Sequence, residues 1–149
     1  MPEHHHCKLY FSIQHLFEQI LFFHAITQCF EKNNSPSIIF VPINANSHWT
    51  LLLLDFERKQ YFLFDPLSAK TSKGNQIITS AIEMLEKSRY LSFSFKEIQH
   101  NSQKGNWQCG YMVLLCAYKY SMGQPIVINE NTINNFRHYL IEILKKSNK

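Results

Sequence analysis

The hydrophobic residues of this chain form two kinds of pattern, short continuous apolar runs and longer helical repeats. Three apolar runs predict β-strands at residues 38–44, 49–56 and 60–66. Because nearly every position in these runs is apolar, we expect the strands to be buried on both faces. Only the polar residues 57–59 separate the second run from the third, so these two strands should pair as a hairpin.

A fourth strand is predicted at residues 90–98, where Leu91, Phe93 and Phe95 alternate with polar residues. This strand should have one face in the core and one face in water. The alternation therefore differs from the continuous runs that precede it.

Apolar residues recur at helical spacing in four further segments. These are residues 12–32, 77–85, 109–120 and 130–146. The segment 109–120 carries few charges, which is typical of a buried helix. The last segment is predicted to be capped at Asn131. Its apolar residues form a single stripe, which is predicted to cover one face of the core. That stripe consists of Ile133, Phe136, Leu140 and Ile143 or Leu144.

Length and composition suit one domain built around this set of elements. The chain has 149 residues, of which 45% are hydrophobic and 17% charged, enough for one sizeable core and too few for two. We therefore predict a single domain over residues 1–149. Its expected class is α+β, with helices packed around a central mixed sheet.

Charge and hydropathy argue against nucleic-acid and membrane partners. The formal charge is +4, but the lysines are scattered, and the cluster Lys145, Lys146 and Lys149 is typical of a solvated helix end. The longest apolar stretch, residues 11–30, is interrupted by too many polar residues for a membrane span. We expect neither nucleic acid nor membrane to be a partner.

The four cysteines indicate a reducing compartment. Cys7, Cys29, Cys109 and Cys116 show no CxxC spacing and no disulfide-scaffold density, so they are predicted to be free thiols of a cytosolic protein. The histidines at 4–6 have no matched partner segment, which is typical of a flexible terminus, and we expect no metal.

Two polar residues stand where chemistry is expected. His48 precedes the strand 49–56, and Asp65 ends the strand 60–66. If the two strands form a hairpin, the start of the first lies beside the end of the second. A carboxylate beside an imidazole fixes one tautomer and favours the protonated ring, as a catalytic base requires.

Cys109 stands at the junction of a polar loop and the predicted helix 109–120. Unpaired N–H groups and the helix dipole at such a position stabilise a thiolate. Gly110, which has no Cβ, lets substrate approach the sulfur. A cysteine at a helix start is commonly a small core residue. Cys116, two turns further, is expected to be such a filler.

These positions resemble a known clan, the ubiquitin-like-protein protease clan of cysteine peptidases, which includes SUMO proteases, the adenovirus protease and bacterial effector deubiquitinases. The resemblance covers residues 41–116 and rests on His48 with Trp49, on FLFDPL around Asp65, and on Gln103 with Cys109 and Gly110. QYFLFDPLSAKTSKGNQ and CGYMV resemble most the deubiquitinase domain of SidE-family bacterial effectors. The resemblance implies a papain-like fold.

By this resemblance, His48 is the general base, Asp65 orients it and Cys109 is the nucleophile. The clan usually places an oxyanion glutamine six positions before the cysteine, which here is Gln103. Gln108, which stands where the clan usually has Asp, and the Cys109 N–H are alternatives.

A narrow channel for a Gly-Gly tail is implied as well. Trp49 would form its aromatic wall, and Trp107 and Gly110 would complete it. Trp49 also fits a core position at a strand start.

The resemblance further implies a cofactor-free, monomeric cysteine peptidase. It would hydrolyse the isopeptide bond after the Gly-Gly of ubiquitin or a ubiquitin-like modifier, with deubiquitination as the expected reaction. A bacterial effector would do so in host cytosol. Three alternatives stay open: an acetyltransferase using acetyl-coenzyme A, a peptide-processing protease, and a binding module with an inactive site.

Overall fold

A computed structural model describes residues 7–9, 37–45, 47–68, 83, 86–87, 92–105 and 107–147. The helix predicted at 12–32 lies outside these residues, as do the histidines at 4–6. The helix predicted at 77–85 lies almost wholly outside them. No helix among the described residues is long and apolar enough to cross a membrane.

The described strands form one mixed sheet in the order β1-β2-β3-β4-β5. Their bounds are Cys7–Leu9, Ile38–Ala45, His48–Asp55, Gln60–Phe64 and Ser94–Phe95. The central strands β2, β3 and β4 pair antiparallel, whereas β1 and β5 pair parallel to their neighbours. The predicted hairpin of β3 and β4 and the mixed character of the sheet are confirmed.

The continuous apolar runs are buried on both faces, as predicted. Leu51, Leu52, Leu53 and Leu54 of β3 are all at most 1% exposed, although their side chains alternate between the two faces. The fourth predicted strand is shorter than expected, because regular pairing covers only β5. Its alternation holds where it is described, since Phe93 is buried and Ser92 and Ser94 are exposed.

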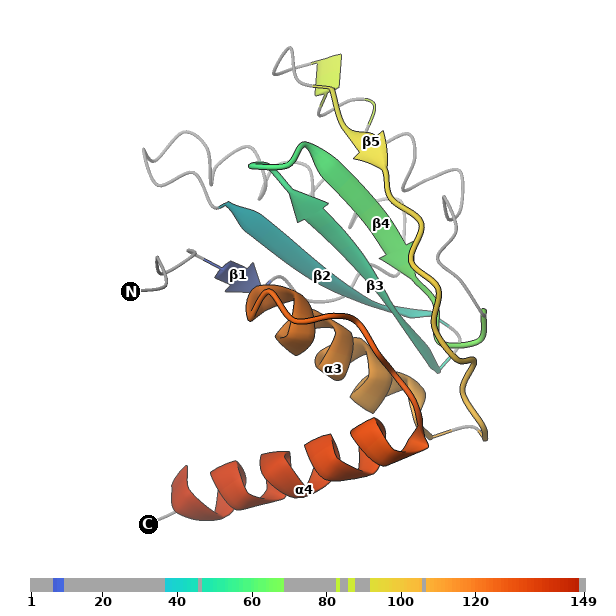
Figure 1. Cartoon of the computed structure of the whole chain (residues 1–149), viewed down its shortest axis with the longest axis vertical. Coiled ribbons are helices and arrows are strands. Elements are labelled where there is room, and N and C mark those ends of the chain that lie inside the picture. The colour runs from blue at the N-terminus through green and yellow to red at the C-terminus, as the bar shows by residue number, and fades with distance from the viewer. Residues whose placement is uncertain are drawn as a thin grey trace.

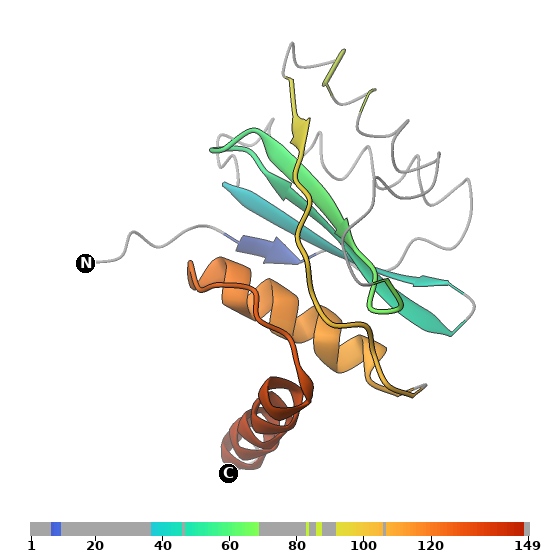
Figure 2. The ribbon, with the colours of Figure 1, turned by 45° about the vertical axis from the view of Figure 1, so that its right-hand side comes forward.

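Two helices lie on one side of the sheet (Figure 1). α3, Cys109–Ser121, packs directly on the sheet, and α4, Glu130–Ser147, packs on α3 (Figure 2). α3 buries one face only, because Leu114 on its other side is 44% exposed. The core between sheet and helices contains Phe40, Leu51, Leu53, Phe62, Phe64, Met112, Val113, Leu115, Cys116, Ile133 and Phe136.

The predictions for α4 need two corrections. The cap is Asn129, not Asn131: its Oδ1 accepts the Thr132 N–H, and the Thr132 hydroxyl accepts the Asn129 N–H. The stripe buries Ile133 and Phe136, but Leu144 is 62% exposed, because the end of α4 extends beyond α3 (Figure 1).

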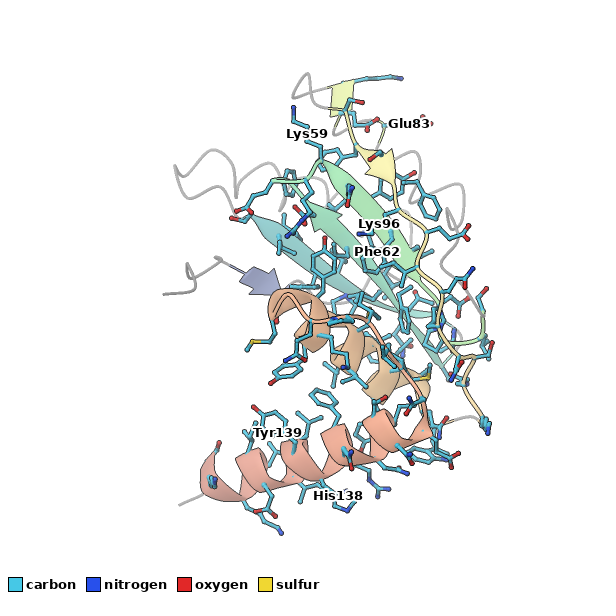
Figure 3. The ribbon with its side chains drawn as sticks, in the orientation of Figure 1. Lys59, Phe62, Glu83, Lys96, His138 and Tyr139 are labelled. Carbon is cyan, nitrogen blue, oxygen red and sulfur yellow. The ribbon has the colours of Figure 1, made fainter. Side chains whose placement is uncertain are left out.

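Aromatic side chains lie on the side of α4 that faces α3. Tyr139 lies toward α3 and His138 lies on the opposite side (Figure 3). The ring of Tyr139 stands 5.8 Å from that of Tyr118 on α3. Aromatic contacts therefore join the two helices.

A buried carboxylate joins the β3–β4 turn to the end of α3. Asp55 is fully buried, and its Oδ2 accepts hydrogen bonds from Tyr120 Oη at 2.6 Å and Arg58 Nη1 at 2.8 Å. Its Oδ1 accepts the Arg58 N–H at 2.8 Å. Burial raises the pKa of Asp55, but these hydrogen bonds lower it by more, so the net shift is downward.

Candidate active site

The termini of three secondary-structure elements lie together at one end of the sheet. The start of β3, the end of β4 and the N-terminus of α3 gather there in both ribbon views (Figures 1 and 2). The predicted residues His48, Asp65 and Cys109 stand at these three ends. The fold therefore places the three segment ends that carry these residues at the same end of the sheet.

His48 is fixed by the tight turn between β2 and β3. Ala45 pairs with His48, three positions further along the chain, so the connection between the two strands is short. Ser47 has φ 62, a left-handed conformation that is uncommon for a residue other than glycine. Backbone strain of this kind persists where the surrounding structure enforces it, here directly before His48.

Asp65 is fixed by the turn that ends β4. Its backbone carbonyl accepts the Ser68 N–H at 3.0 Å, and its Oδ1 accepts the Leu67 N–H at 3.0 Å. Pro66 suits the second position of such a turn and cannot continue the strand. Contacts within residues 65–68 thus hold the carboxylate in place.

His48 and Asp65 are in direct contact, as the hairpin predicted. His48 Nε2 lies 2.8 Å from Asp65 Oδ1, with both side chains partly exposed. Because a carboxylate accepts, Nε2 carries the proton in this pair. The basic nitrogen of the neutral ring is therefore Nδ1, which is left to exchange a proton with another group.

Cys109 is the first residue of α3 and is 5% exposed. It makes no hydrogen bond to His48 or Asp65 among the described contacts. It lines an open groove of about 370 Å³ together with Ser47 and Trp49, the two sequence neighbours of His48. The groove therefore brings the histidine segment and the cysteine to the same surface.

Trp49 lies close to Gly110, and both residues line this groove. A Cβ on Gly110 would lie 3.6 Å from Trp49 Cδ1, an ordinary contact distance. The indole thus lies against the backbone of the first turn of α3. Both residues line the groove beside Cys109, as the predicted channel requires.

Trp107 precedes Cys109 by two positions in the sequence and is 53% exposed. The Arg137 guanidinium of α4 lies 5.6 Å from the centre of its ring, and the Tyr111 ring meets it edge-on at 6.1 Å. A cation and an aromatic edge thus hold an exposed ring in one orientation. Trp107 and Tyr111 both line the groove.

Gln103 lies in the loop that precedes α3. Its N–H donates to the Pro66 carbonyl at 2.7 Å, which attaches the loop to the turn after Asp65. Its Nε2 donates to the Gly105 carbonyl at 2.7 Å, and Gly105 has φ 90, which favours glycine. One of the two Nε2 hydrogens therefore remains for another acceptor.

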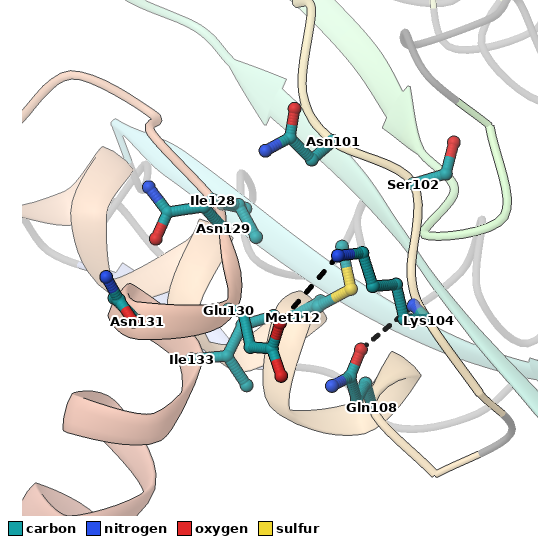
Figure 4. A pocket seen from close by; sticks show the side chains of 10 residues that line it. All are labelled: Asn101, Ser102, Lys104, Gln108, Met112, Ile128, Asn129, Glu130, Asn131 and Ile133. Carbon is teal, nitrogen blue, oxygen red and sulfur yellow. Dashed lines mark hydrogen bonds and ion pairs between the residues drawn. The ribbon is translucent and has the colours of Figure 1, made fainter.

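Gln108, the alternative oxyanion donor, lies in a different cavity. Its Oε1 accepts the Lys104 N–H at 3.0 Å and so closes the loop before α3. It is 6% exposed and lines a cavity of about 300 Å³ between this loop and the start of α4, which does not contain Cys109 (Figure 4). Neither Gln103 nor Gln108 is among the residues that line the Cys109 groove, so the choice between them as oxyanion donor stays a prediction.

Cys116 contrasts with Cys109. It is 0% exposed in the core, and burial raises the pKa of its thiol well above the ordinary value. Among the described residues, no group of three histidine, cysteine or acidic side chains is placed to hold a metal ion.

Three residues of the groove were not predicted from the sequence, namely Ser47, Tyr111 and Leu114. Tyr111 and Leu114, three positions apart, lie on one side of α3, and Trp107 stands four positions before Tyr111 in the loop before the helix. This spacing was a usable signal, but the low charge of the segment suggested a helix buried all round.

A mixed sheet, a histidine bonded to a carboxylate at a strand start and a cysteine at the head of the packed helix form the arrangement expected of an α+β cysteine protease. The family model described as the Ulp1 protease family, C-terminal catalytic domain, matches residues 14–147. The chain belongs to this family of cysteine proteases. Among curated protein sequences no match is found.

Solved structures share the fold at low identity. A SUMO protease Ulp1 with its catalytic cysteine oxidised to a sulfenic acid is 18% identical, with a TM-score of 0.65 over 93% of this chain and 70% of that one. The C-terminal Ulp1 protease domain in complex with Smt3, the yeast ortholog of SUMO, is 19% identical, with a TM-score of 0.60 over 85% and 64%.

A bacterial structure is also similar. The central domain of an uncharacterised protein, Lpg1148, from Legionella pneumophila is 13% identical, with a TM-score of 0.54 over 95% of this chain and 85% of that one. The predicted α+β ubiquitin-like-protease fold is thereby confirmed.

Proposed function

We propose that this chain is a catalytic domain that hydrolyses the isopeptide bond after the C-terminal Gly-Gly of ubiquitin or a ubiquitin-like modifier. The observation that carries the proposal is the 2.8 Å contact between His48 Nε2 and Asp65 Oδ1, at the end of the sheet where Cys109 begins α3. Membership of the Ulp1 protease family supports it.

In the proposed mechanism the Cys109 thiol gives its proton to His48 Nδ1. Asp65 holds the ring by Nε2 and stabilises the imidazolium. The thiolate attacks the carbonyl carbon of the terminal glycine, and the carbonyl oxygen becomes an oxyanion. The free Nε2 hydrogen of Gln103 and the Cys109 N–H hold that oxyanion.

Collapse of this intermediate breaks the bond to the lysine nitrogen, which leaves as an amine with the proton from His48. A water molecule, deprotonated by the neutral His48, then hydrolyses the thioester and restores the thiol. Each step uses only groups of this chain, the substrate and water.

The groove supplies the substrate contacts in this proposal. Trp49 lies against Gly110, and the glycine tail would pass beside them. Trp107, which lines the same groove, would form a second aromatic contact with the tail.

Among modifiers we place ubiquitin first, because two stretches resemble SidE-type deubiquitinase domains. A delivered bacterial effector acting in host cytosol fits that resemblance. SUMO is the second candidate, since a structure with this fold is a complex with Smt3.

The test uses ubiquitin, SUMO and NEDD8 probes that carry a thiol-reactive group at the C-terminus, with intact mass as the readout. We expect one adduct on the wild type and none on Cys109→Ala, while Cys116→Ala serves as the matched control and still reacts. An adduct that survives Cys109→Ala would overturn the assignment of the nucleophile.

Absence of any adduct would count against the isopeptidase reaction. Acetyl transfer would then be tested by adding acetyl-coenzyme A and measuring a mass increase on Cys109.

A further inference from the structure

A buried histidine that the proposed mechanism does not use lies in the loop between β5 and α3. His100 is 8% exposed, and its ring lies 4.4 Å from the ring of Phe64, centre to centre. Its Nδ1 lies 3.1 Å from the Asn101 carbonyl, which can only accept, so Nδ1 carries the proton. In the neutral ring Nε2 then holds a lone pair.

The contact of His100 with Phe64 attaches this loop to the end of β4. Phe64 directly precedes Asp65. A further attachment is the hydrogen bond from the Gln103 N–H to the Pro66 carbonyl, and Pro66 directly follows Asp65. The loop thus contacts β4 and its turn on both sides of the carboxylate that orients His48.

We propose that His100 is a positioning residue: its neutral ring docks the loop 96–105 against Phe64 and thereby holds Gln103 in place beside Asp65. The docking itself is independent of the reaction. Its consequence for catalysis rests on the proposed function, because there Gln103 stabilises the oxyanion.

The docking requires a neutral ring. His100 Nε2 is buried and has no hydrogen-bond partner among the described residues. Protonation would place a charged N–H there without an acceptor, which is costly in a buried site. Burial lowers the pKa of His100, by more than its bond to Asn101 and the charge of Asp65 raise it. Asp65 is the charged group that acts on the ring from β4.

The sign of the pH effect follows from these contributions. An undocked His100 titrates near its ordinary value of about 6.5, and the docked ring titrates lower. Docking is therefore complete above pH 6.5 or so and weakens as pH falls below that value. The attachment of Gln103 should weaken over the same range.

The test measures amide hydrogen exchange of Gln103, expressed as a protection factor, at pH 7.5 and pH 5.5. We compare the wild type with His100→Ala, which removes the ring, and with His100→Phe, which keeps an aromatic ring but cannot be protonated. His138→Phe is the matched control, because His138 is exposed and also bonds a backbone carbonyl.

We expect His100→Ala to reduce the protection of the Gln103 amide about tenfold at both pH values, the equivalent of one lost hydrogen bond. The wild type and His138→Phe should lose protection at pH 5.5, whereas His100→Phe should keep it. Equal loss of protection in His100→Phe and wild type at pH 5.5 would overturn the proposal. If His100→Ala does not fold, the comparison of His100→Phe with the wild type still tests the proposal.

Activity is the second measurement. With the modifier substrate that the wild type cleaves, His100→Ala should lower kcat with little change in KM, because Gln103 acts on the transition state. Unchanged kcat despite lost protection would refute the catalytic consequence. If protection follows the expectation and no modifier is cleaved by any variant, the proposed function fails and the docking role stands.

Discussion

Replacing Tyr120 with Phe removes one hydrogen bond from the buried carboxylate of Asp55, at the end of the sheet away from the candidate site. The bond is 2.6 Å long and runs to a fully buried carboxylate. Hydrogen bonds to charged groups contribute about 1.5–3 kcal/mol to stability. Both hydrogen bonds from Arg58 remain, so Asp55 keeps partners, and we expect a loss of about 2 kcal/mol.

That loss should be measurable in two ways. For a chain of this size, about 2 kcal/mol corresponds to a decrease of roughly 4–8 °C in Tm. Urea unfolding followed by tryptophan fluorescence gives the free energy of unfolding directly. The matched control is Tyr118→Phe on the same helix, whose hydroxyl makes no hydrogen bond to a described residue.

The difference should also depend on pH. Because the net shift lowers the pKa of Asp55, its ionised form stabilises the fold above its ordinary value of about 3.9. That stabilisation is lost as pH falls through the lower, folded-state value. In Tyr120→Phe the pKa should rise, since burial then acts with less opposition. The free energy of unfolding of the wild type should therefore clearly exceed that of Tyr120→Phe at pH 7, and the difference should be much smaller near pH 2.

A difference that is the same at both pH values, or no larger than that of Tyr118→Phe, would refute this account of Asp55. Modifier cleavage at 25 °C should be nearly unchanged in Tyr120→Phe. Asp55 and the site occupy opposite ends of β3.

Three further predictions concern the site. Asp65→Asn should keep the fold and lower kcat by about 10⁴, as loss of the orienting carboxylate does in a comparable triad, and a decrease below tenfold would contradict its role. Gln103→Ala should lower kcat by about 10²–10³ and Gln108→Ala by much less, with the reverse order assigning the donor to Gln108. At pH 6 iodoacetamide should alkylate Cys109 faster than Cys116, as peptide mass mapping will show, and equal rates would contradict a reactive Cys109.

The part of the site that could be predicted from the sequence is the part built by local pairing. His48 and Asp65 meet because two neighbouring strands form a hairpin, and both strands are visible as apolar runs. The turn residues around Asp65 are equally local. Pairing of the two strands as a hairpin therefore predicted the contact between His48 and Asp65, which lie 17 positions apart in the sequence.

Contacts made by packed helices could not be predicted in this way. The bond between Tyr120 and Asp55 spans 65 positions, and the contact of Arg137 with Trp107 joins α4 to the loop before α3. Both depend on how the helices cross the sheet, which hydrophobic periodicity does not specify. The exposed end of α4 has the same cause. The apolar stripe of α4 continues beyond the part of the helix that packs on α3.

The sequence contained a signal for the cap of α4 that the prediction of Asn131 did not use. Asn129 and Asn131 are equally good capping residues by type. Thr132, three positions after Asn129, completes the reciprocal pair of hydrogen bonds and selects the first of them. The spacing of partner residues is thus more informative than the capping residue alone.

The replacement of the clan's usual Asp by Gln108 affects the electrostatics at the head of α3. Gln108 is the N-cap residue, and its side chain makes no capping hydrogen bond, because it closes the loop at Lys104 instead. The first turn of α3 contains no acidic residue either. No carboxylate of a described residue therefore engages the N–H groups of this turn, where it would compete with an oxyanion for them. In the proposed mechanism, Gln108 in place of Asp thus leaves the positive end of the helix dipole to act on the sulfur and on the developing negative charge.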